Sequence, residues 1–138
     1  MKAYLVDTNI LLDVIGADTQ FGECSKNCLT RCAVDGVLVI DPVIYAGVGA
    51  VIASIEELDE LLPRSLFRRD PIPWEASYLA GRALRRYRSR GGSRNRVLAD
   101  FLIGAHATVT GMELITRDRG YARYFEISIV DPAATEDQ

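Results

Sequence analysis

Short apolar runs alternate along the chain with longer segments in which apolar residues recur every three or four positions. The short runs predict strands over residues 3–6, 37–40, 113–116 and 127–130, with a weaker candidate at 66–67. The longer segments, bounded by capping residues, glycine or proline, predict helices over residues 10–15, 20–34, 42–53, 55–62, 74–87, 94–109 and 119–124. Because strands and helices alternate, we expect an α/β fold of three layers, in which helices flank a central, mostly parallel sheet.

Length and composition agree with one compact domain. The chain has 138 residues, of which 49% are hydrophobic and 25% charged, which is enough to build a core. We expect a single domain over residues 1–132 and a frayed C-terminal tail over residues 133–138. The formal net charge of −3 gives no overall attraction to nucleic acid. No apolar run reaches the roughly 18 residues that a bilayer requires, so we expect a cytoplasmic protein without membrane association.

Three acidic residues stand out because each lies in or beside an apolar segment. Asp7 directly follows the first predicted strand, Asp118 follows the strand at 113–116, and Asp100 is the only acid in a long apolar helical stretch. Parallel strands end at one edge of a sheet, where α/β proteins form their sites. Singly, each acid has a simpler interpretation as a helix cap, a turn residue or a solvent-facing side chain. Together they favour a pocket for a hard divalent cation, which offsets their mutual repulsion.

Cys24, Cys28 and Cys32 recur at intervals of four and therefore share one face of the helix predicted at 20–34. No histidine or further cysteine is near them in the sequence. We therefore favour a packed or half-buried face over a metal site, and neighbouring helical positions do not readily form disulfides.

Several segments resemble the PIN-domain proteins, and in particular the VapC toxins of bacterial toxin–antitoxin pairs. They are Val6–Asp13, Pro42–Ala46, Leu98–Ala107, Thr116–Asp118 and Tyr124–Phe125, in the family's order and over nearly the whole chain. The resemblance implies a PIN-like fold, an endoribonuclease that hydrolyses RNA phosphodiester bonds with Mg²⁺ or Mn²⁺, a VapB-type antitoxin partner and a homodimer. It also implies that Asp7, Asp100 and Asp118 bind the metal and that Thr8 supports the first acid.

One acid of the family's pattern is missing, and this predicts weak metal binding and impaired catalysis. The family's Tyr-Ala-Glu is replaced here by Tyr45-Ala46-Gly47, and Gly47 has no side chain to hold a metal or to orient water. Glycine also costs a helix about 1 kcal/mol relative to alanine. Three interpretations are open: a naturally weakened enzyme, compensation by a nearby acid such as Asp41, or an inactivating substitution. We favour the last because the rest of the pattern is intact and Asp41 lies before Pro42.

A second signal concerns substrate binding. Residues 76–99 contain seven arginines, Arg94 and Arg96 among them, and no acid before Asp100. This local positive field suits a phosphate backbone, and Tyr87 is a candidate to stack on an unpaired base. The RNA-binding candidates are Arg82, Arg85, Arg86, Arg88 and Arg117. The alternative is a solvated face whose arginines pair with acids such as Glu56, Glu57 and Glu60 or with an acidic antitoxin tail.

Other polar and aromatic residues have simpler interpretations. His106, the only histidine, is expected to be a packed or partly exposed helix residue in preference to a catalytic base. Trp74 and Tyr45 are expected in the core or in a dimer interface.

Two classes of function stay open. One is a metal-dependent toxin ribonuclease impaired by Gly47, and the other is a catalytically inactive protein that binds RNA or antitoxin on the same scaffold. A phosphotransfer or phosphatase domain is disfavoured, because no second Asp stands two residues after Asp7.

Overall fold

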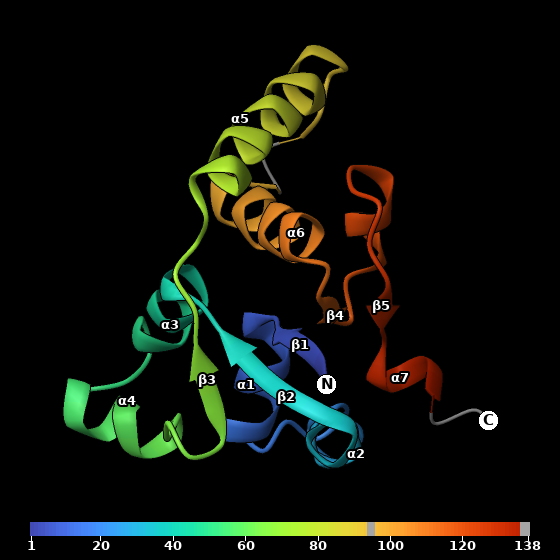
Figure 1. The fold of residues 1–138 in the computed structure, drawn as a ribbon. Coiled ribbons are helices and arrows are strands. Elements are labelled where there is room, and N and C mark those ends of the chain that lie inside the picture. The colour runs from blue at the N-terminus through green and yellow to red at the C-terminus, as the bar shows by residue number, and fades with distance from the viewer. Residues whose placement is uncertain (94–95, 136–138) are drawn as a thin grey trace.

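The centre of the molecule is a parallel sheet. In the computed structural model, which describes residues 1–93 and 96–135, the sheet has five strands in the order β3-β2-β1-β4-β5. They are β1 (Lys2–Val6), β2 (Gly36–Ile40), β3 (Phe67–Arg69), β4 (Glu113–Ile115) and β5 (Ile129–Val130). Every pairing is parallel (Figure 1). The predicted α/β class is confirmed, and the sheet expected to be mostly parallel is parallel throughout.

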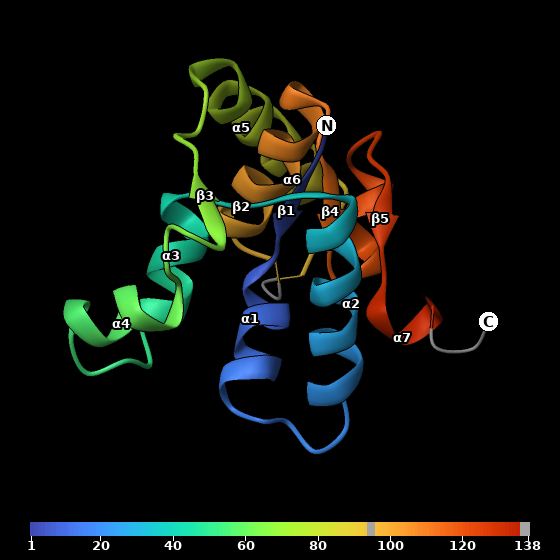
Figure 2. The same ribbon diagram turned by 60° about the horizontal axis from the view of Figure 1, so that its bottom comes forward.

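Helices cover both faces of this sheet. The helices are α1 (Thr8–Ile15), α2 (Gly22–Asp35), α3 (Pro42–Gly49), α4 (Ile55–Leu61), α5 (Trp74–Ser89), α6 (Leu98–Thr110) and α7 (Pro132–Thr135), with a 3₁₀ turn, η1, at Arg119–Arg123. The pair α1 and α2 lies on one face, and α6, backed by α5, lies on the other (Figure 2). Helix α3 contacts both α1 and α6. The expected three-layer arrangement is therefore present.

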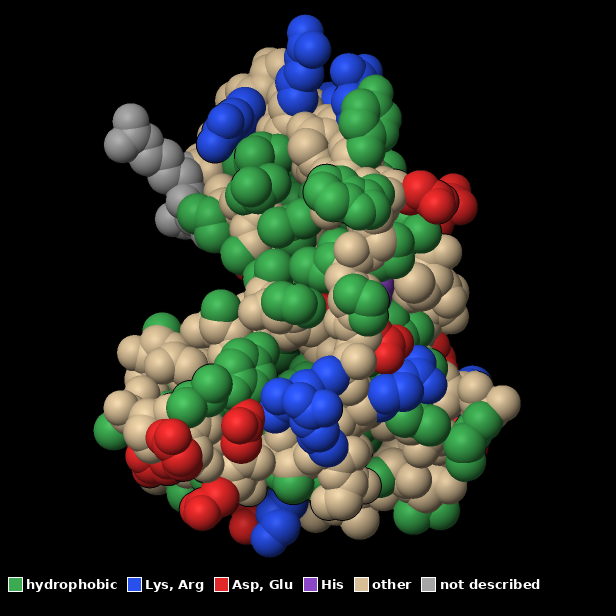
Figure 3. Space-filling model, turned by 60° about the vertical axis from the view of Figure 1, so that its left-hand side comes forward, with side chains coloured by type: hydrophobic (Ala, Val, Ile, Leu, Met, Phe, Trp, Pro, Cys, Tyr) green, Lys and Arg blue, Asp and Glu red, His purple; other side chains and the backbone are tan. Residues whose placement is uncertain are grey.

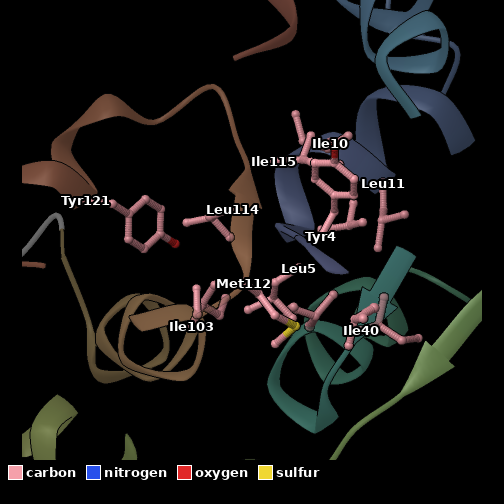
Figure 4. Packing of buried hydrophobic residues seen from close by; sticks show 14 of the residues in the cluster. Tyr4, Leu5, Ile10, Leu11, Ile40, Ile103, Met112, Leu114, Ile115 and Tyr121 are labelled. Carbon is pink, nitrogen blue, oxygen red and sulfur yellow. The ribbon is translucent and has the colours of Figure 1, made fainter. Parts of the chain in front are cut away.

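The core forms where β1 and β4 lie side by side. Leu5, Val6, Leu114 and Ile115 have no exposed surface, as their position in the middle of a sheet covered on both faces requires. Tyr121 of η1 enters this core beside Leu114 (Figure 4) and is only 2% exposed. The turn after β4 is thereby anchored against the sheet.

An aromatic cluster joins α5, α6 and the segment after η1. The rings of Tyr87, Phe101 and Tyr124 contact one another with centroids 5.4 to 5.5 Å apart. Tyr87 is buried, and its hydroxyl donates to the Ser93 carbonyl. The prediction that Tyr87 stacks on a base is therefore wrong, because packing uses its ring.

Three helical predictions differ from the structure. Helix α3 ends at Gly49 and not near residue 53, in keeping with the two glycines in its last turn. Residues 133–135 belong to α7, which packs against α2, so the predicted tail is helical at its start. Helix α6 begins at Leu98, and the start predicted at Arg94 lies outside the described residues, as do residues 136–138.

The expectations for the three cysteines and for Trp74 have different outcomes. The cysteine face of α2 is packed, with Cys28 and Cys32 buried and Cys24 half-buried. Trp74, by contrast, is 91% exposed, so the core alternative for this residue is wrong. Among the residues that the structure describes, no helix is long and apolar enough to cross a membrane.

Two helical glycines give a matched test of the packing. A Cβ at Gly104 in α6 would lie 2.5 Å from Cε2 of Phe125, whereas a Cβ at Gly81 in α5 would meet nothing within 4 Å. We expect Gly104→Ala to lower the free energy of unfolding by about 2 kcal/mol, and Gly81→Ala to raise it by about 0.5 to 1 kcal/mol. Urea titration measures both, and equal effects would contradict this packing.

Candidate active site

Asp7 stands at the carboxyl end of β1, where the chain turns into α1. It is 5% exposed. Its Oδ1 accepts the Thr8 amide at 2.7 Å, which caps α1, and its Oδ2 accepts the Thr116 hydroxyl at 2.8 Å. Asp7 is thus a helix cap, as the simpler interpretation held, and also a buried carboxylate at the edge of the sheet.

Asp118 stands at the same edge, after β4. Its Oδ1 accepts the Gly120 amide at 2.9 Å and Nη2 of Arg96 at 2.7 Å. Its own amide donates to the Thr116 hydroxyl oxygen at 3.0 Å. Thr116 therefore holds both acids through one hydroxyl. Residue order alone did not indicate this role, although Thr116 stands in the Thr-Arg-Asp segment that carried part of the family resemblance.

Asp100 lies in the first turn of α6. It is half-buried, and its Oδ2 accepts the Val97 amide at 3.1 Å, so it also helps to begin its helix. Its charge adds to the raised pKa of Asp7, and burial, followed by the charges of Asp7, Asp100 and Asp118, raises the pKa of Tyr121. The three predicted acids thus share one electrostatic environment around Tyr121.

Burial is the main cause of the raised pKa of Asp7. Hydrogen bonds from Thr116, the Thr8 amide and Tyr121 act in the opposite direction, and the charge of Asp100 adds to the increase. A buried carboxylate that neighbouring charges destabilise is the kind of group that binds a proton or a cation.

The donor chemistry fits a hard divalent cation, because the three side chains offer carboxylate oxygens. The arrangement, however, is not a finished cage. Within residues 1–93 and 96–135, no three His, Cys, Asp or Glu side chains stand close enough to hold one ion, and Asp118 is bound to Arg96. The positive charge of Arg96 on Oδ1 of Asp118 opposes a cation at this carboxylate.

Gly47 in α3 faces Thr8 of α1. A Cβ at position 47 would lie 2.8 Å from Cγ2 and 2.9 Å from Oγ1 of Thr8. The glycine thus lets α3 approach α1 closely, which is a packing reason for Gly47 that helix propensity alone does not provide. A longer side chain here requires the Thr8 side chain to move.

Asp41 does not replace the missing glutamate. Its Oδ1 accepts the Ile44 amide at 2.9 Å, and its Oδ2 lies 2.8 Å from Nδ1 of His106. Both side chains are at most 1% exposed. The expectation that His106 is a packed helix residue is confirmed. Its contact with Asp41 could not be predicted from the sequence, because the two residues are far apart along the chain.

Arg117 is held by a structural ion pair. Its Nε and Nη2 donate to the two carboxylate oxygens of Asp13 at 2.8 and 2.9 Å, and its guanidinium lies 4.0 Å from the centre of the Phe21 ring. Asp13 is buried and also accepts the Ser25 hydroxyl. These contacts make Arg117 a link between β4, α1 and α2, and its contact with RNA stays a prediction.

The other arginine candidates form an exposed set on α5. Arg82, Arg85, Arg86 and Arg88 are all exposed, and Figure 3 shows Lys and Arg side chains gathered at the end of the molecule that α5 forms. In the described parts of the chain, none of the ion pairs joins these arginines to Glu56, Glu57 or Glu60. Arg94 lies outside the described residues.

Comparison with known proteins agrees with this architecture. The family model of the PIN domain matches residues 4–126. The VapBC-1 structure from nontypeable Haemophilus influenzae is similar with a TM-score of 0.72 and 17% identity, over 95% of this chain and 98% of that chain. The VapBC2 structure from Rickettsia felis, bound to a promoter DNA fragment, has a TM-score of 0.70 and 18% identity, with 94% and 98% covered.

A third similar structure is VapC20 of Mycobacterium tuberculosis, described as a toxin that cleaves the sarcin–ricin loop. Its TM-score is 0.64 at 13% identity, over 89% of this chain and 96% of that chain. At these identities the likeness concerns the fold. No curated protein matches the sequence.

Asp7→Asn is expected to stabilise the fold at neutral pH. Burial raises the pKa of Asp7 above its ordinary value of 3.8, so a charged Asp7 costs folding free energy above that raised pKa. Asparagine keeps an acceptor for the Thr8 amide and removes the charge, and the free energy of unfolding at pH 7 should rise by about 1 kcal/mol. The gain shrinks as the pH falls through the folded pKa and vanishes below 3.8, where both states are protonated.

Denaturant titrations across this pH range measure the effect, and Asp13→Asn is the control. Asp13 is also buried but is paired with Arg117, so its replacement should lower stability at pH 7 by about 2 kcal/mol. A loss of stability in both variants would contradict the account of Asp7.

Proposed function

The chain belongs to the PIN-domain family, and from this premise we propose that it is an endoribonuclease of the toxin–antitoxin type, which hydrolyses RNA phosphodiester bonds in the cytoplasm. The observation that carries the proposal is that Asp7 and Asp118 follow neighbouring parallel strands at one edge of the sheet and share the Thr116 hydroxyl.

Asp7, Asp100 and Asp118 would hold Mg²⁺ or Mn²⁺. The bound ion supplies a water of lowered pKa and polarises the scissile phosphate. The chain's own residues prepare these acids: the Thr116 hydroxyl fixes Asp7, the Gly120 amide fixes Asp118, and the Val97 amide fixes Asp100. These hydrogen bonds fix one oxygen of each acid, but the three side chains would still have to move closer together to share one ion.

The RNA backbone would lie along the exposed arginines of α5. Arg82, Arg85, Arg86 and Arg88 are exposed and have no acidic residue between them in the sequence. Guanidinium groups suit phosphate oxygens because they donate two parallel hydrogen bonds. The local charge therefore supports RNA binding despite the negative total charge.

A catalytically inactive protein that binds RNA or antitoxin is the second candidate. It is favoured by Gly47, which provides no carboxylate and packs against Thr8, and by the bond between Asp118 and Arg96. Both features lower the ribonuclease activity that we expect of this chain. Restoring a carboxylate at position 47 therefore distinguishes the two candidate functions.

We also propose a VapB-type antitoxin and a second copy of the chain as partners. A hollow of about 480 Å³ between α1, α2, α4 and β3 offers an apolar seat for an amphipathic antitoxin segment. Leu11, Ile15, Leu29, Val34, Leu61 and Leu66 line it. For the homodimer, Trp74 and Tyr78 of α5 are 91% and 72% exposed, as is typical of aromatic anchors in an interface.

Restoring the family's acid should increase activity. We expect Gly47→Glu to raise the rate of Mn²⁺-dependent RNA cleavage by about a hundredfold or more, because a positioned carboxylate helps to bind the metal and to take a proton from water. Cleavage of a labelled single-stranded RNA measures it. Gly47→Gln is the matched control, since it meets the same Thr8 side chain without a carboxylate, and equal rates in the two variants would argue for the inactive binder.

Removing the α5 arginines should weaken RNA binding and make the remaining binding less dependent on salt concentration. With Arg82, Arg85, Arg86 and Arg88 changed to Gln, the slope of log K against log salt should fall by about 0.7 for each phosphate that the protein no longer neutralises. Arg64→Gln, an exposed change outside α5, serves as the control. Fluorescence anisotropy with a short RNA measures both, and an unchanged slope would assign these arginines to another partner.

A further inference from the structure

Arg96 is the basic residue that pairs with one of the predicted catalytic acids in the described structure. Its Nη2 is 2.7 Å from Oδ1 of Asp118, and the two side chains are 18% and 37% exposed. The guanidinium also lies 5.6 Å from the centre of the Tyr121 ring and 5.9 Å from that of Tyr124. Arg96 is therefore held by a carboxylate and two aromatic faces at once.

The charges of the site act together on this guanidinium. Burial alone would lower the pKa of Arg96, but the hydrogen bond and charge of Asp118, with the charge of Asp100, outweigh it and raise the pKa. Arg96 thus interacts with two of the three acids expected to bind metal.

The backbone makes room for this contact at Gly120. A Cβ on that residue would collide with the Arg96 guanidinium and would lie 2.9 Å from Oδ1 of Asp118. The absence of a side chain at position 120 is therefore a condition of the Arg96–Asp118 bond, and the Gly120 amide adds a hydrogen bond to the same oxygen.

We propose that Arg96 is a built-in counter-cation of the acidic site, which neutralises Asp118 and competes with a divalent metal ion for it. This inference rests on the proposed function in one respect only, namely that Asp118 is a metal ligand. A guanidinium on Asp118 and a metal ion on the same carboxylate repel each other, so each weakens the binding of the other. The chain would then bind a metal ion more weakly while Arg96 stays on Asp118.

Metal affinity tests this directly. We expect Arg96→Gln to bind Mn²⁺ about tenfold more tightly than the unchanged protein, because the metal no longer displaces a bound cation. Calorimetric titration with MnCl₂ and the electron paramagnetic resonance signal of free Mn²⁺ measure it without RNA. Thermal unfolding adds a second readout, in which Mn²⁺ should raise the melting temperature of Arg96→Gln more than that of the unchanged protein.

Two further variants make the test specific. Arg119→Gln removes a positive charge next to Asp118 in the sequence, but Arg119 is paired with Asp131, so we expect its Mn²⁺ affinity to change by about twofold at most. Arg96→Met removes the positive charge and keeps a flexible apolar side chain beside the Tyr121 and Tyr124 rings, and it should tighten Mn²⁺ binding as Arg96→Gln does. This second variant keeps the test decisive if Arg96→Gln does not fold.

The outcomes separate the inference from the proposed function. Unchanged Mn²⁺ affinity in Arg96→Gln and Arg96→Met, an equal increase in Arg119→Gln, or no binding of Mn²⁺ by any of the proteins would overturn the role of Arg96. Tighter Mn²⁺ binding without RNA cleavage by Gly47→Glu would support the role of Arg96 and refute the ribonuclease. RNA cleavage by Gly47→Glu together with unchanged Mn²⁺ affinity in Arg96→Gln would support the ribonuclease and refute the role of Arg96.

Discussion

The site depends on a carboxylate buried at the junction of two central strands. Asp7 ends β1 where β4 is its neighbour, and the Thr116 hydroxyl from the end of β4 donates to it at 2.8 Å. A buried charge is costly unless hydrogen bonds and opposite charges stabilise it. The Thr8 amide, Thr116 and Tyr121 provide the hydrogen bonds. The positions of α1, η1 and the second acid follow from satisfying this one group.

Charge balance explains the remainder of the site. Within the described structure, Arg96 pairs with Asp118, and its guanidinium lies over the Tyr121 ring. Gly47 removes one acid from the family's pattern and lets α3 pack against Thr8. The chain thus has fewer negative charges than the pattern implies and one internal cation, and both features favour a folded protein over a strong metal site. This is the usual conflict between stability and activity in an acidic centre.

Prediction from the sequence succeeded where the signal was local. Strand and helix positions followed from hydrophobic periodicity, and Asp7 and Asp118 were assigned to one edge because both follow strands. Prediction failed for Tyr87, which is buried by Phe101 and Tyr124. The sequence also did not indicate the bond between Arg117 and Asp13, 104 residues away. Neither partner could be read from the neighbouring residues, because chain-distant contacts leave no periodic pattern.

By itself, the sequence determined the α/β class, the acids that follow the strands and the arginine-rich helix, because each is a property of residue order. The missing glutamate became visible only through the resemblance to the PIN-domain family. Only the tertiary structure decided which charges neutralise one another. It paired Asp118 with Arg96, Asp13 with Arg117 and Asp41 with His106. Electrostatic energy depends on distance and burial, and both are fixed only when the sheet and its helices bring distant segments together.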